Sequence, residues 1–198
     1  MSAPVRSFTL FFDGPDVLGD GRLDALFEAG FDDAVIGERD GAQYAAFDRA
    51  APSLGAALGD AISGLEQAIP GLRVTRIEPD SLVTMAEIAR RAGVSREQVR
   101  LLSVGRRGPG GFPPPIAEVD GRTRLWYWPE VAHWLVEHGR LPTDGLADVD
   151  ADLIAAVNAA LTLRVRLPSV RDDRGMGLIR GTVAGSLQVE VGAARASA

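Results

Sequence analysis

The sequence predicts an α+β protein with two folded segments and a C-terminal helix. In residues 1–80, short apolar runs with strand character alternate with stretches whose apolar residues recur at helical spacing. Residues 84–139 hold two capped helices and a hairpin, and residues 150–164 repeat apolar side chains every three or four positions. The 198 residues, 46% of them hydrophobic, can form one large core or two small ones.

The N-terminal segment has six expected elements in the order βαββαβ. Asp13-Gly14-Pro15 ends the first apolar run with turn residues, and Pro70-Gly71 closes the second helical stretch. A ferredoxin-like domain has this order of elements, so we expect residues 1–78 to adopt that fold. The strands are expected at residues 5–12, 33–37, 42–48 and 72–77, and the helices at residues 22–30 and 52–69.

Two capping motifs mark a pair of helices after a linker at residues 78–80. Thr84 is followed three residues later by Glu87, and Ser95 by Gln98, so each helix begins with the sequence of a capping box. Two capped helices joined by a glycine turn predict a helix-turn-helix. Its expected core residues are Ile88, Ala89, Val94, Val99 and Leu102.

A hairpin and a third helix follow this pair. Residues 105–115 contain four glycines and four prolines, so we expect an irregular loop there. Residues 116–119 and 123–127 flank an Asp-Gly pair, which favours a tight hairpin turn. Pro129 suits the first turn of a helix that stops at Gly139. We expect the three tryptophans in the core of this segment, at Trp126, Trp128 and Trp134.

The C-terminal part is expected to hold one amphipathic helix and a tail. Residues 150–164 place Leu153, Val157 and Leu161 on one stripe, and we assign the helical segment to residues 146–166. Residues 168–198 alternate only weakly and contain many glycines. We therefore expect poorly anchored strands or disorder in that tail.

The charge is distributed unevenly along a chain whose 21 basic residues are all arginine. Residues 1–80 hold 6 arginines against 14 acidic residues, a net charge of −8, whereas residues 81–142 hold 9 against 6, a net charge of +3. Residues 143–198 carry a net charge of −1. Only the middle segment is therefore suited to a polyanionic partner.

Several classes of chemistry have no support in the composition. Without lysine there is no Schiff-base chemistry and no phosphate-binding P-loop, and without cysteine there is no disulfide, no thiolate nucleophile and no cysteine-ligated metal. His133 and His138 are five residues apart, which does not align them on one helical face. We therefore expect no enzyme, no cofactor and no metal site. No apolar stretch is long enough to span a membrane and no signal-peptide pattern opens the chain, so we expect a soluble cytoplasmic protein.

Four motifs occur together in the middle segment. They are A-E-I-A-x-x-x-G-V-S-x-x-x-V at Ala86–Val99, F-P-x-P at Phe112–Pro115, an aromatic strand end at Leu125–Trp128, and a V-x-x-W-L helix within Glu130–Leu135. In these motifs the segment resembles the DNA-binding domains of the AlpA/excisionase and MerR-type families. The resemblance covers about residues 82–138 and implies that residues 82–140 form a winged helix-turn-helix that binds double-stranded DNA.

The resemblance also implies which side chains contact DNA. A recognition helix lies in the major groove with its N-terminal residues nearest the base edges. An arginine there can bond both guanine acceptors, and a glutamate can accept from a cytosine amino group. Arginines of the wing and of the loop before it would meet phosphates or the minor groove. The expected DNA contacts are Ser95, Arg96, Glu97 and Arg100 on the helix, Arg106 and Arg107 in the loop, and Arg122 and Arg124 on the wing.

Three functions stay open at this point. The first is a sequence-specific DNA-binding protein, most readily a transcriptional regulator, and the second is an excisionase-like factor that bends DNA for a recombinase. The third is an antitoxin-like adaptor whose acidic N-terminal segment binds a basic protein and whose helix-turn-helix only autoregulates. Unlike excisionases, the chain has a large segment in front, and its 150–164 helix is too short for the coiled coil of MerR regulators. We expect a homodimer or a partner protein to bind through residues 1–78 or 146–166.

Overall fold

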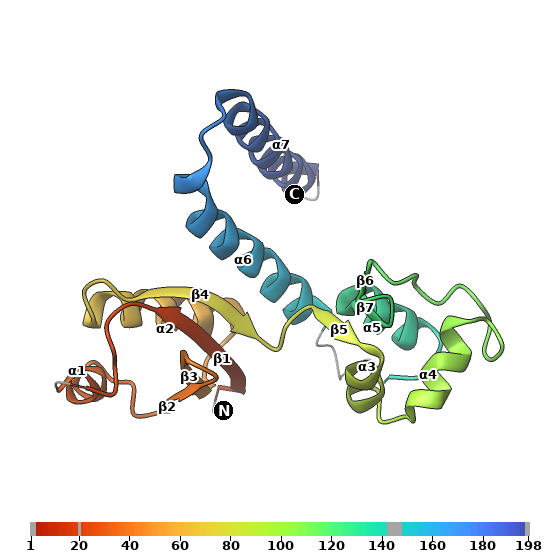
Figure 1. Ribbon diagram of the computed structural model, residues 1–198, viewed down its shortest axis with the longest axis horizontal. Coiled ribbons are helices and arrows are strands. Elements are labelled where there is room, and N and C mark those ends of the chain that lie inside the picture. The colour runs from red at the N-terminus through yellow and green to blue at the C-terminus, as the bar shows by residue number, and fades with distance from the viewer. Residues whose placement is uncertain (1–2, 20, 142–147, 197–198) are drawn as a thin grey trace. The chain divides into compact units, whose positions relative to one another are not determined.

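The computed structural model describes residues 3–19, 21–141 and 148–196 (Figure 1). The predicted α+β class is confirmed, because the chain combines helices with two antiparallel sheets. The chain divides into two compact units, residues 1–159 and residues 160–198.

The first sheet has the strand order β2-β3-β1-β4, and each neighbouring pair is antiparallel. The predicted order of six elements is confirmed, and the boundaries differ from the expected ones by no more than two residues. The elements are β1 (Val5–Asp13), α1 (Arg22–Glu28), β2 (Ala34–Arg39), β3 (Ala42–Ala50), α2 (Leu54–Ala68) and β4 (Arg73–Glu78).

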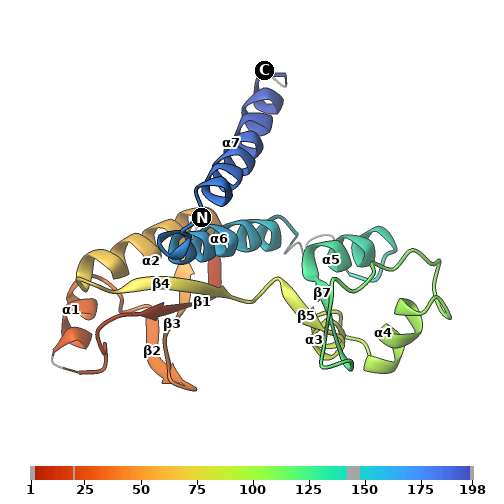
Figure 2. The ribbon, with the colours of Figure 1, turned by 45° about the horizontal axis from the view of Figure 1, so that its top comes forward.

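The core of this segment lies between the sheet and its helices. Phe8, Leu10 and Phe12 alternate along β1 and are buried, as period-two side chains of one sheet face should be. Helix α2 contributes Leu58 and Leu65 and contacts β1, β4 and α1. Figure 2 shows α2 running beside β4 and β1. Burying each of these large side chains stabilises the folded state by about 1.5–3 kcal/mol. The spacing of apolar residues in the sequence therefore determines which face of the sheet packs against the helices.

Side chains occupy the outer edge of β4. The Glu66 carboxylate accepts a hydrogen bond from the Val74 N–H (3.0 Å). Asn158 of α6 (Asp148–Arg166) accepts from the Ile77 N–H through Oδ1 (2.7 Å) and donates to the Ile77 carbonyl through Nδ2 (2.9 Å). The side-chain amide thus supplies the two bonds that a further strand would otherwise make.

The middle segment has a second sheet, of strand order β5-β7-β6, and three helices. Strand β5 was not expected from the sequence, because three residues are too few to show a period; it forms by pairing Leu82 with Tyr127 and Thr84 with Leu125. The elements are β5 (Leu82–Thr84), α3 (Met85–Arg91), α4 (Arg96–Ser103), β6 (Ala117–Val119), β7 (Thr123–Tyr127) and α5 (Trp128–Glu137).

The two predicted capping motifs differ in the structure. The Ser95 hydroxyl accepts from the Gln98 N–H (3.2 Å) and the Gln98 side chain accepts from the Ser95 N–H (3.0 Å), so the capping box of α4 is complete. The Thr84 hydroxyl accepts from the Glu87 N–H (3.3 Å), but the Glu87 carboxylate binds two arginines instead of returning to the cap. Helix α3 therefore has half of the expected box.

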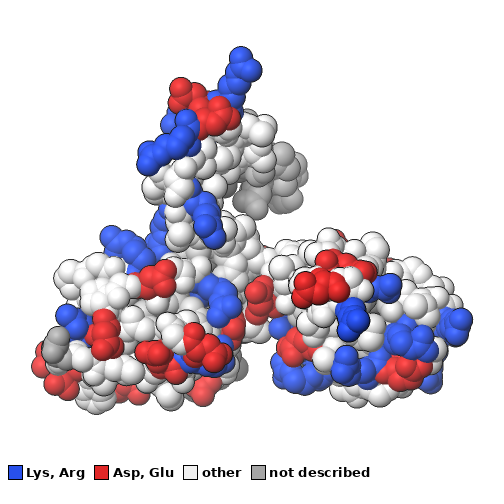
Figure 3. Space-filling model, viewed as in Figure 1, with Lys and Arg blue, Asp and Glu red and all other residues white. Residues whose placement is uncertain are grey.

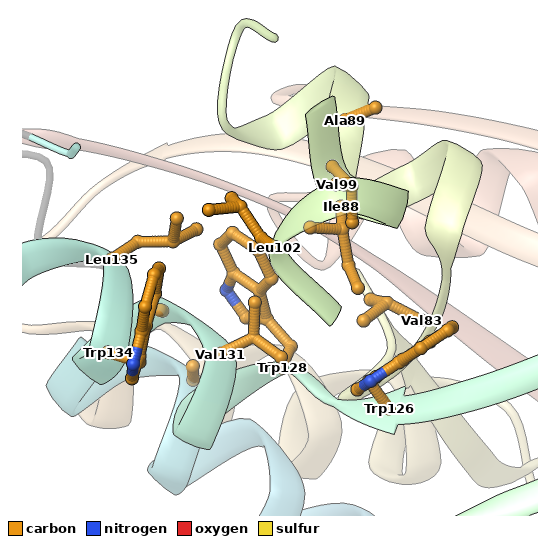
Figure 4. Packing of buried hydrophobic residues seen from close by; sticks show 12 residues of the cluster. Val83, Ile88, Ala89, Val99, Leu102, Trp126, Trp128, Val131, Trp134 and Leu135 are labelled. Atoms are coloured by element: carbon orange, nitrogen blue, oxygen red, sulfur yellow. The ribbon is translucent and has the colours of Figure 1, made fainter. Parts of the chain in front are cut away.

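The core of the middle segment contains the three tryptophans, as predicted (Figure 4). Trp126 lies against Val83 of β5, while Trp134 and Leu135 come from α5. The indole N–H groups of Trp126 and Trp134 donate to the carbonyls of Pro113 and Gly110 (both 3.1 Å). These bonds satisfy the buried polar tips and tie the glycine- and proline-rich loop to the core.

The expectation for residues 168–198 was wrong, because they include the helix α7 (Asp173–Ala196). The Asp172 carboxylate accepts from the N–H groups of Arg174 (3.2 Å) and Gly175 (2.9 Å), which satisfies two of the orphan donors of the first turn. This local cap, followed by many leucine, valine and alanine residues, outweighs the cost of the glycines. Helix α6 is confirmed, and residues 146 and 147 of its expected range lie outside the described residues.

Among the described residues, no helix combines the length and the apolar character that crossing a membrane requires.

Candidate nucleic-acid interface

Helix α4 turns one face to the core and the other to solvent. Val99 and Leu102 are buried three residues apart, which fixes the rotation of the helix. Arg96, Glu97 and Arg100 consequently lie on the exposed side, as predicted. The Ser95 capping box fixes where the helix starts and therefore how these three side chains are presented.

The hairpin between β6 and β7 presents the second group of arginines. Asp120 (φ 53°) and Gly121 (φ 63°) both have positive φ, and the Arg122 N–H donates to the Val119 carbonyl (3.2 Å), as in a type I′ turn. The strand register pairs Val119 with Thr123, so Arg122 belongs to the loop. Arg122 at the loop and the exposed Arg124 on β7 are two residues apart.

The structure brings four of the predicted arginines to one groove. Arg96 and Arg100 enter it from α4, and Arg122 and Arg124 enter it from the hairpin. The groove has a volume of about 360 Å³ and lies entirely within the middle segment. Its remaining lining residues are Thr84, Met85, Ala86, Glu118, Gly121, Thr123 and Trp126.

Two of the four arginines are held by carboxylates. Arg100 donates to Glu97 through Nη2 (2.6 Å) and Nε (2.7 Å), and this hydrogen bond lowers the pKa of the Glu97 carboxyl and raises that of Arg100. Arg124 Nε lies 3.4 Å from Glu118 Oε2 across the hairpin. Both pairs are exposed and screened by water, so each arginine can exchange its carboxylate for another anion at small cost.

The other two arginines of the groove are available. Within the described part of the chain, neither Arg96 nor Arg122 has a carboxylate partner, and both are exposed. The groove is therefore lined by four guanidinium groups and one carboxylate, that of Glu118, while the Glu97 carboxylate is bound to Arg100 and does not line the groove. Its net charge is positive although the whole chain carries −6.

Arg106 and Arg107 lie outside the groove, in the loop that follows α4. Their N–H groups both donate to the Leu101 carbonyl (2.9 and 3.1 Å), which anchors the start of the loop to the helix end. Both side chains are exposed. In Figure 3, basic side chains line the lower part of the body that holds α3 and α4, with acidic side chains among them.

Sequence reasoning missed the carboxylate and the hydroxyls of the groove. An Asp-Gly pair favours a two-residue turn, in which Glu118 would not oppose Arg124. The observed loop has three residues, as the expected strand bounds implied, and its register sets Glu118 against Arg124. Thr84 and Thr123 enter the groove from two strands, and only the pairing of β5 with β7 brings those strands together.

A second cluster of charges lies on α3. Its members, Glu87, Arg90 and Arg91, follow groove residues in the sequence but do not line the groove. Glu87 accepts from Arg90 (2.6 and 2.8 Å) and from Arg91 (2.7 Å), and Arg91 also stacks on the Trp128 ring at 4.9 Å. The hydrogen bond from Arg90, reinforced by Arg91 and opposed by desolvation, lowers the pKa of Glu87 to about 2. These contacts fix α3 against the core.

The described residues contain no group of three or more histidine, aspartate and glutamate side chains that could hold a metal ion. His138 stacks on Trp134 at a ring distance of 4.3 Å, and its Nδ1 lies 2.7 Å from the Trp134 carbonyl oxygen. His133 is exposed on α5. The two histidines thus have separate surroundings.

No protein-family model, no curated protein and no solved structure matches this chain. The geometry of the groove therefore carries the functional argument by itself.

Proposed function

We propose that the chain is a sequence-specific DNA-binding protein, a transcriptional regulator without enzymatic activity. In this proposal residues 1–78 are a ferredoxin-like domain and residues 82–140 a winged helix-turn-helix of the AlpA/excisionase and MerR type. The observation that carries the proposal is the groove in which Arg96 and Arg100 from α4 meet Arg122 and Arg124 from the hairpin.

The topology supports both domain assignments. A four-stranded antiparallel sheet of order β2-β3-β1-β4, with helices after the first and third strands, is what a ferredoxin-like domain requires. Two helices joined by a tight turn, followed by a hairpin and a third helix, is the arrangement of a winged helix-turn-helix.

The exposed face of α4 has the size and chemistry for the major groove of B-DNA. That groove is about 12 Å wide and admits one α-helix. Arg96 and Arg100 are one helical turn apart on the same face, so both can address base edges or the phosphates that border them. Glu97 lies between them and can accept from a cytosine amino group once it releases Arg100.

The remaining predicted residues have supporting roles. Arg122 and Arg124 on the hairpin, with Arg106 and Arg107 in the loop that follows α4, are exposed and suit phosphates. The Ser95 hydroxyl is engaged in the capping box, so we assign Ser95 to positioning the helix rather than to DNA contact.

A selection experiment tests this proposal. The full chain is incubated with a randomised DNA duplex library, and bound duplexes are amplified and sequenced over several rounds. We expect one motif to be enriched by the wild-type chain and lost in the double variant Arg96→Ala, Arg122→Ala. The control is Arg73→Ala, which removes one exposed arginine of the N-terminal segment, on β4, and should enrich the same motif. Enrichment of no motif by the wild-type chain contradicts sequence-specific binding.

One observation favours the adaptor as a second candidate. The N-terminal segment holds 14 acidic residues against 6 arginines within residues 1–80, which suits a basic partner protein. A stoichiometric complex with such a protein, formed by the wild-type chain without DNA, would select the adaptor. DNA bending without any effect on transcription would select the architectural factor.

A further inference from the structure

The two edges of the first sheet differ in whether other groups bind their outward backbone N–H and C=O groups. The β4 edge is capped by the side chains of Glu66 and Asn158, which bind the backbone of Val74 and Ile77. Strand β2 forms the opposite edge. Its residues include no proline and no lysine, and its register with β3 is continuous, without a bulge. Of the devices that commonly protect an exposed edge, proline, lysine and a bulge are therefore missing from β2, and its two charged residues, Glu38 and Arg39, lie together at its C-terminal end.

The outward backbone groups of β2 can be identified from its pairing. The Asp33 carbonyl accepts from the Asp48 N–H (3.5 Å), so the backbone groups of Asp33 face β3. Because these groups alternate along a strand, those of Ala34, Ile36 and Glu38 face away from the sheet. The Ala34 N–H is bonded to the Phe31 carbonyl (3.3 Å), and no described residue bonds the outward groups of Ile36 and Glu38.

Large apolar side chains flank this edge on both faces of the sheet. Val35 is 67% exposed on the open face. On the helical face, α1 presents Phe27, 68% exposed, and Leu23, 40% exposed. Both line a hollow of about 280 Å³ whose floor includes Ile36 of β2. An unpaired strand between two exposed apolar surfaces is a surface for strand addition.

The geometry points to a second copy of this chain as the occupant, with β2 pairing antiparallel to β2 of that copy about a two-fold axis at Ile36. In this register Ile36 pairs with Ile36 of the second copy, and the Glu38 N–H groups reach the Ala34 carbonyls, so four backbone hydrogen bonds form. The free carbonyl of Ala34, both outward groups of Ile36 and the Glu38 N–H are thus used together.

The side chains fit one another in the same register. Asp33 lies opposite Arg39 of the second copy at both ends of the paired segment. Within its own chain Asp33 is bound by Arg49 (2.7 and 2.8 Å) and Arg39 by Glu78 (2.8 Å), so these charges are already paired and neither repel nor add a contact across the axis. Val35 lies opposite Gly37, over which the Tyr44 ring lies so closely that a Cβ there would be 3.0 Å from its hydroxyl. Val35 therefore gains an apolar neighbour. The two α1 helices flank the axis on the helical face, where each Phe27 is removed from water.

This inference goes beyond the proposed function and does not depend on it, because the pairing surface lies in the N-terminal segment and the test contains no DNA. The sequence left open whether a homodimer forms through residues 1–78 or through residues 146–166. The proposed β2 pairing places the dimer contact within residues 1–78.

The first test measures the mass of the full chain in solution by sedimentation velocity or light scattering, at about 100 µM. We expect about twice the chain mass of 20.9 kDa for the wild type, and the single mass for the double variant Val35→Lys, Phe27→Glu. The control is Val5→Lys, because Val5 is 62% exposed on β1 of the same sheet and two strands from the edge. This variant should stay dimeric. A monomeric wild type, or a double variant that stays dimeric, overturns the proposal.

The second test reports the register and does not depend on disrupting the dimer. Because the chain has no cysteine, Ile36→Cys introduces one thiol per copy. In the proposed pairing the two Cα atoms at this position are about 5.5 Å apart, within disulfide range, whereas those of a Val35→Cys variant are about 8 Å apart. Mild oxidation should therefore link Ile36→Cys chains rapidly and Val35→Cys chains poorly, although residue 35 is highly exposed. Equal or reversed linking overturns the proposed register.

Discussion

Glu97 and Arg100 hold each other on the exposed face of α4 through two hydrogen bonds, Arg100 Nη2 to Glu97 Oε1 at 2.6 Å and Arg100 Nε to Glu97 Oε2 at 2.7 Å. Both residues belong to the set proposed to read DNA. The guanidinium fork that would bind guanine is thus occupied by a carboxylate in the free protein. Because the pair is exposed, replacing the Glu97 carboxylate by a base or a phosphate as the partner of Arg100 costs little free energy. The DNA must still supply a group that binds Arg100 as well as Glu97 does, and a random duplex meets this requirement less well.

Removing that carboxylate should make binding stronger but less selective. We expect Glu97→Gln to raise the affinity for a random duplex several-fold, because it releases Arg100 and deletes a negative charge beside the groove. The preference for the selected motif should fall at the same time. Fluorescence anisotropy with the two duplexes measures both quantities. Glu130→Gln makes the same charge change on α5 outside the groove and serves as control; an equal effect of both variants would contradict the role given to Glu97.

Arg100 and Arg106 should differ in what they contribute. Arg100→Ala should weaken binding to the selected motif by about 1–3 kcal/mol, and weaken random-duplex binding less. Arg106→Ala should weaken both duplexes about equally and reduce the slope of log K against log salt by about 1, as the loss of one phosphate contact does. The affinities of each variant for the two duplexes, measured over a salt series, show whether each arginine contacts a base or a phosphate. The opposite ranking would overturn the division between base and phosphate contacts.

Gly14 should be one of the most sensitive positions for stability. Its φ is +130°, and a Cβ there would be 2.7 Å from the Gly71 carbonyl oxygen. Gly14→Ala should therefore lower the free energy of unfolding by at least about 2 kcal/mol, through both steric overlap and a strained backbone. Gly21→Ala is the matched control, since Gly21 has φ +71° but no atom within 4 Å of its would-be Cβ, and should cost about 1 kcal/mol. Urea unfolding measures both, and equal losses would contradict the close approach.

The ion pairs of Glu87 should make stability depend on pH in acid. The folded-state pKa of about 2 lies below the ordinary value of 4.5, so protonation of Glu87 opposes folding. The pairs stabilise the fold fully above about pH 4.5, and their contribution is lost as the pH falls from there to about 2. Wild type should therefore be more stable than Glu87→Gln at pH 6, and the difference should shrink by pH 3. A difference that is constant across this range would contradict the account.

The sequence predicted those parts of the fold that depend on local patterns. Alternating apolar residues and helical stripes located the six elements of the N-terminal segment, and the Ser95–Gln98 box located the start of α4. Strand β5 could not be predicted, because it forms only by pairing with β7, some forty residues later in the chain. Helix α7 was missed because the many glycines of residues 168–198 were taken to disfavour a helix, and the cap formed by Asp172 was not recognised in the sequence.

The candidate site was predictable in its residues but not in its internal pairing. Exposure of the α4 arginines followed from the buried Val99 and Leu102, which are spaced to cover one side of the helix. The three-residue spacing of Glu97 and Arg100 is compatible with an ion pair, but only the side-chain geometry identifies it. The position of Glu118 opposite Arg124 follows from the three-residue loop that the expected strands at 116–119 and 123–127 left between them, but the sequence interpretation did not consider Glu118 as a partner of Arg124.

The most direct test of the central claim is a fluorescence-anisotropy titration of the full chain against its own upstream DNA and against a random duplex, at several salt concentrations. We predict at least about a thousandfold preference for the upstream duplex and a slope of log K against log salt near −4, from about 0.9 for each of the arginines assigned to phosphates, Arg106, Arg107, Arg122 and Arg124. No binding, or equally weak binding to both duplexes, would contradict the claim that this groove reads DNA.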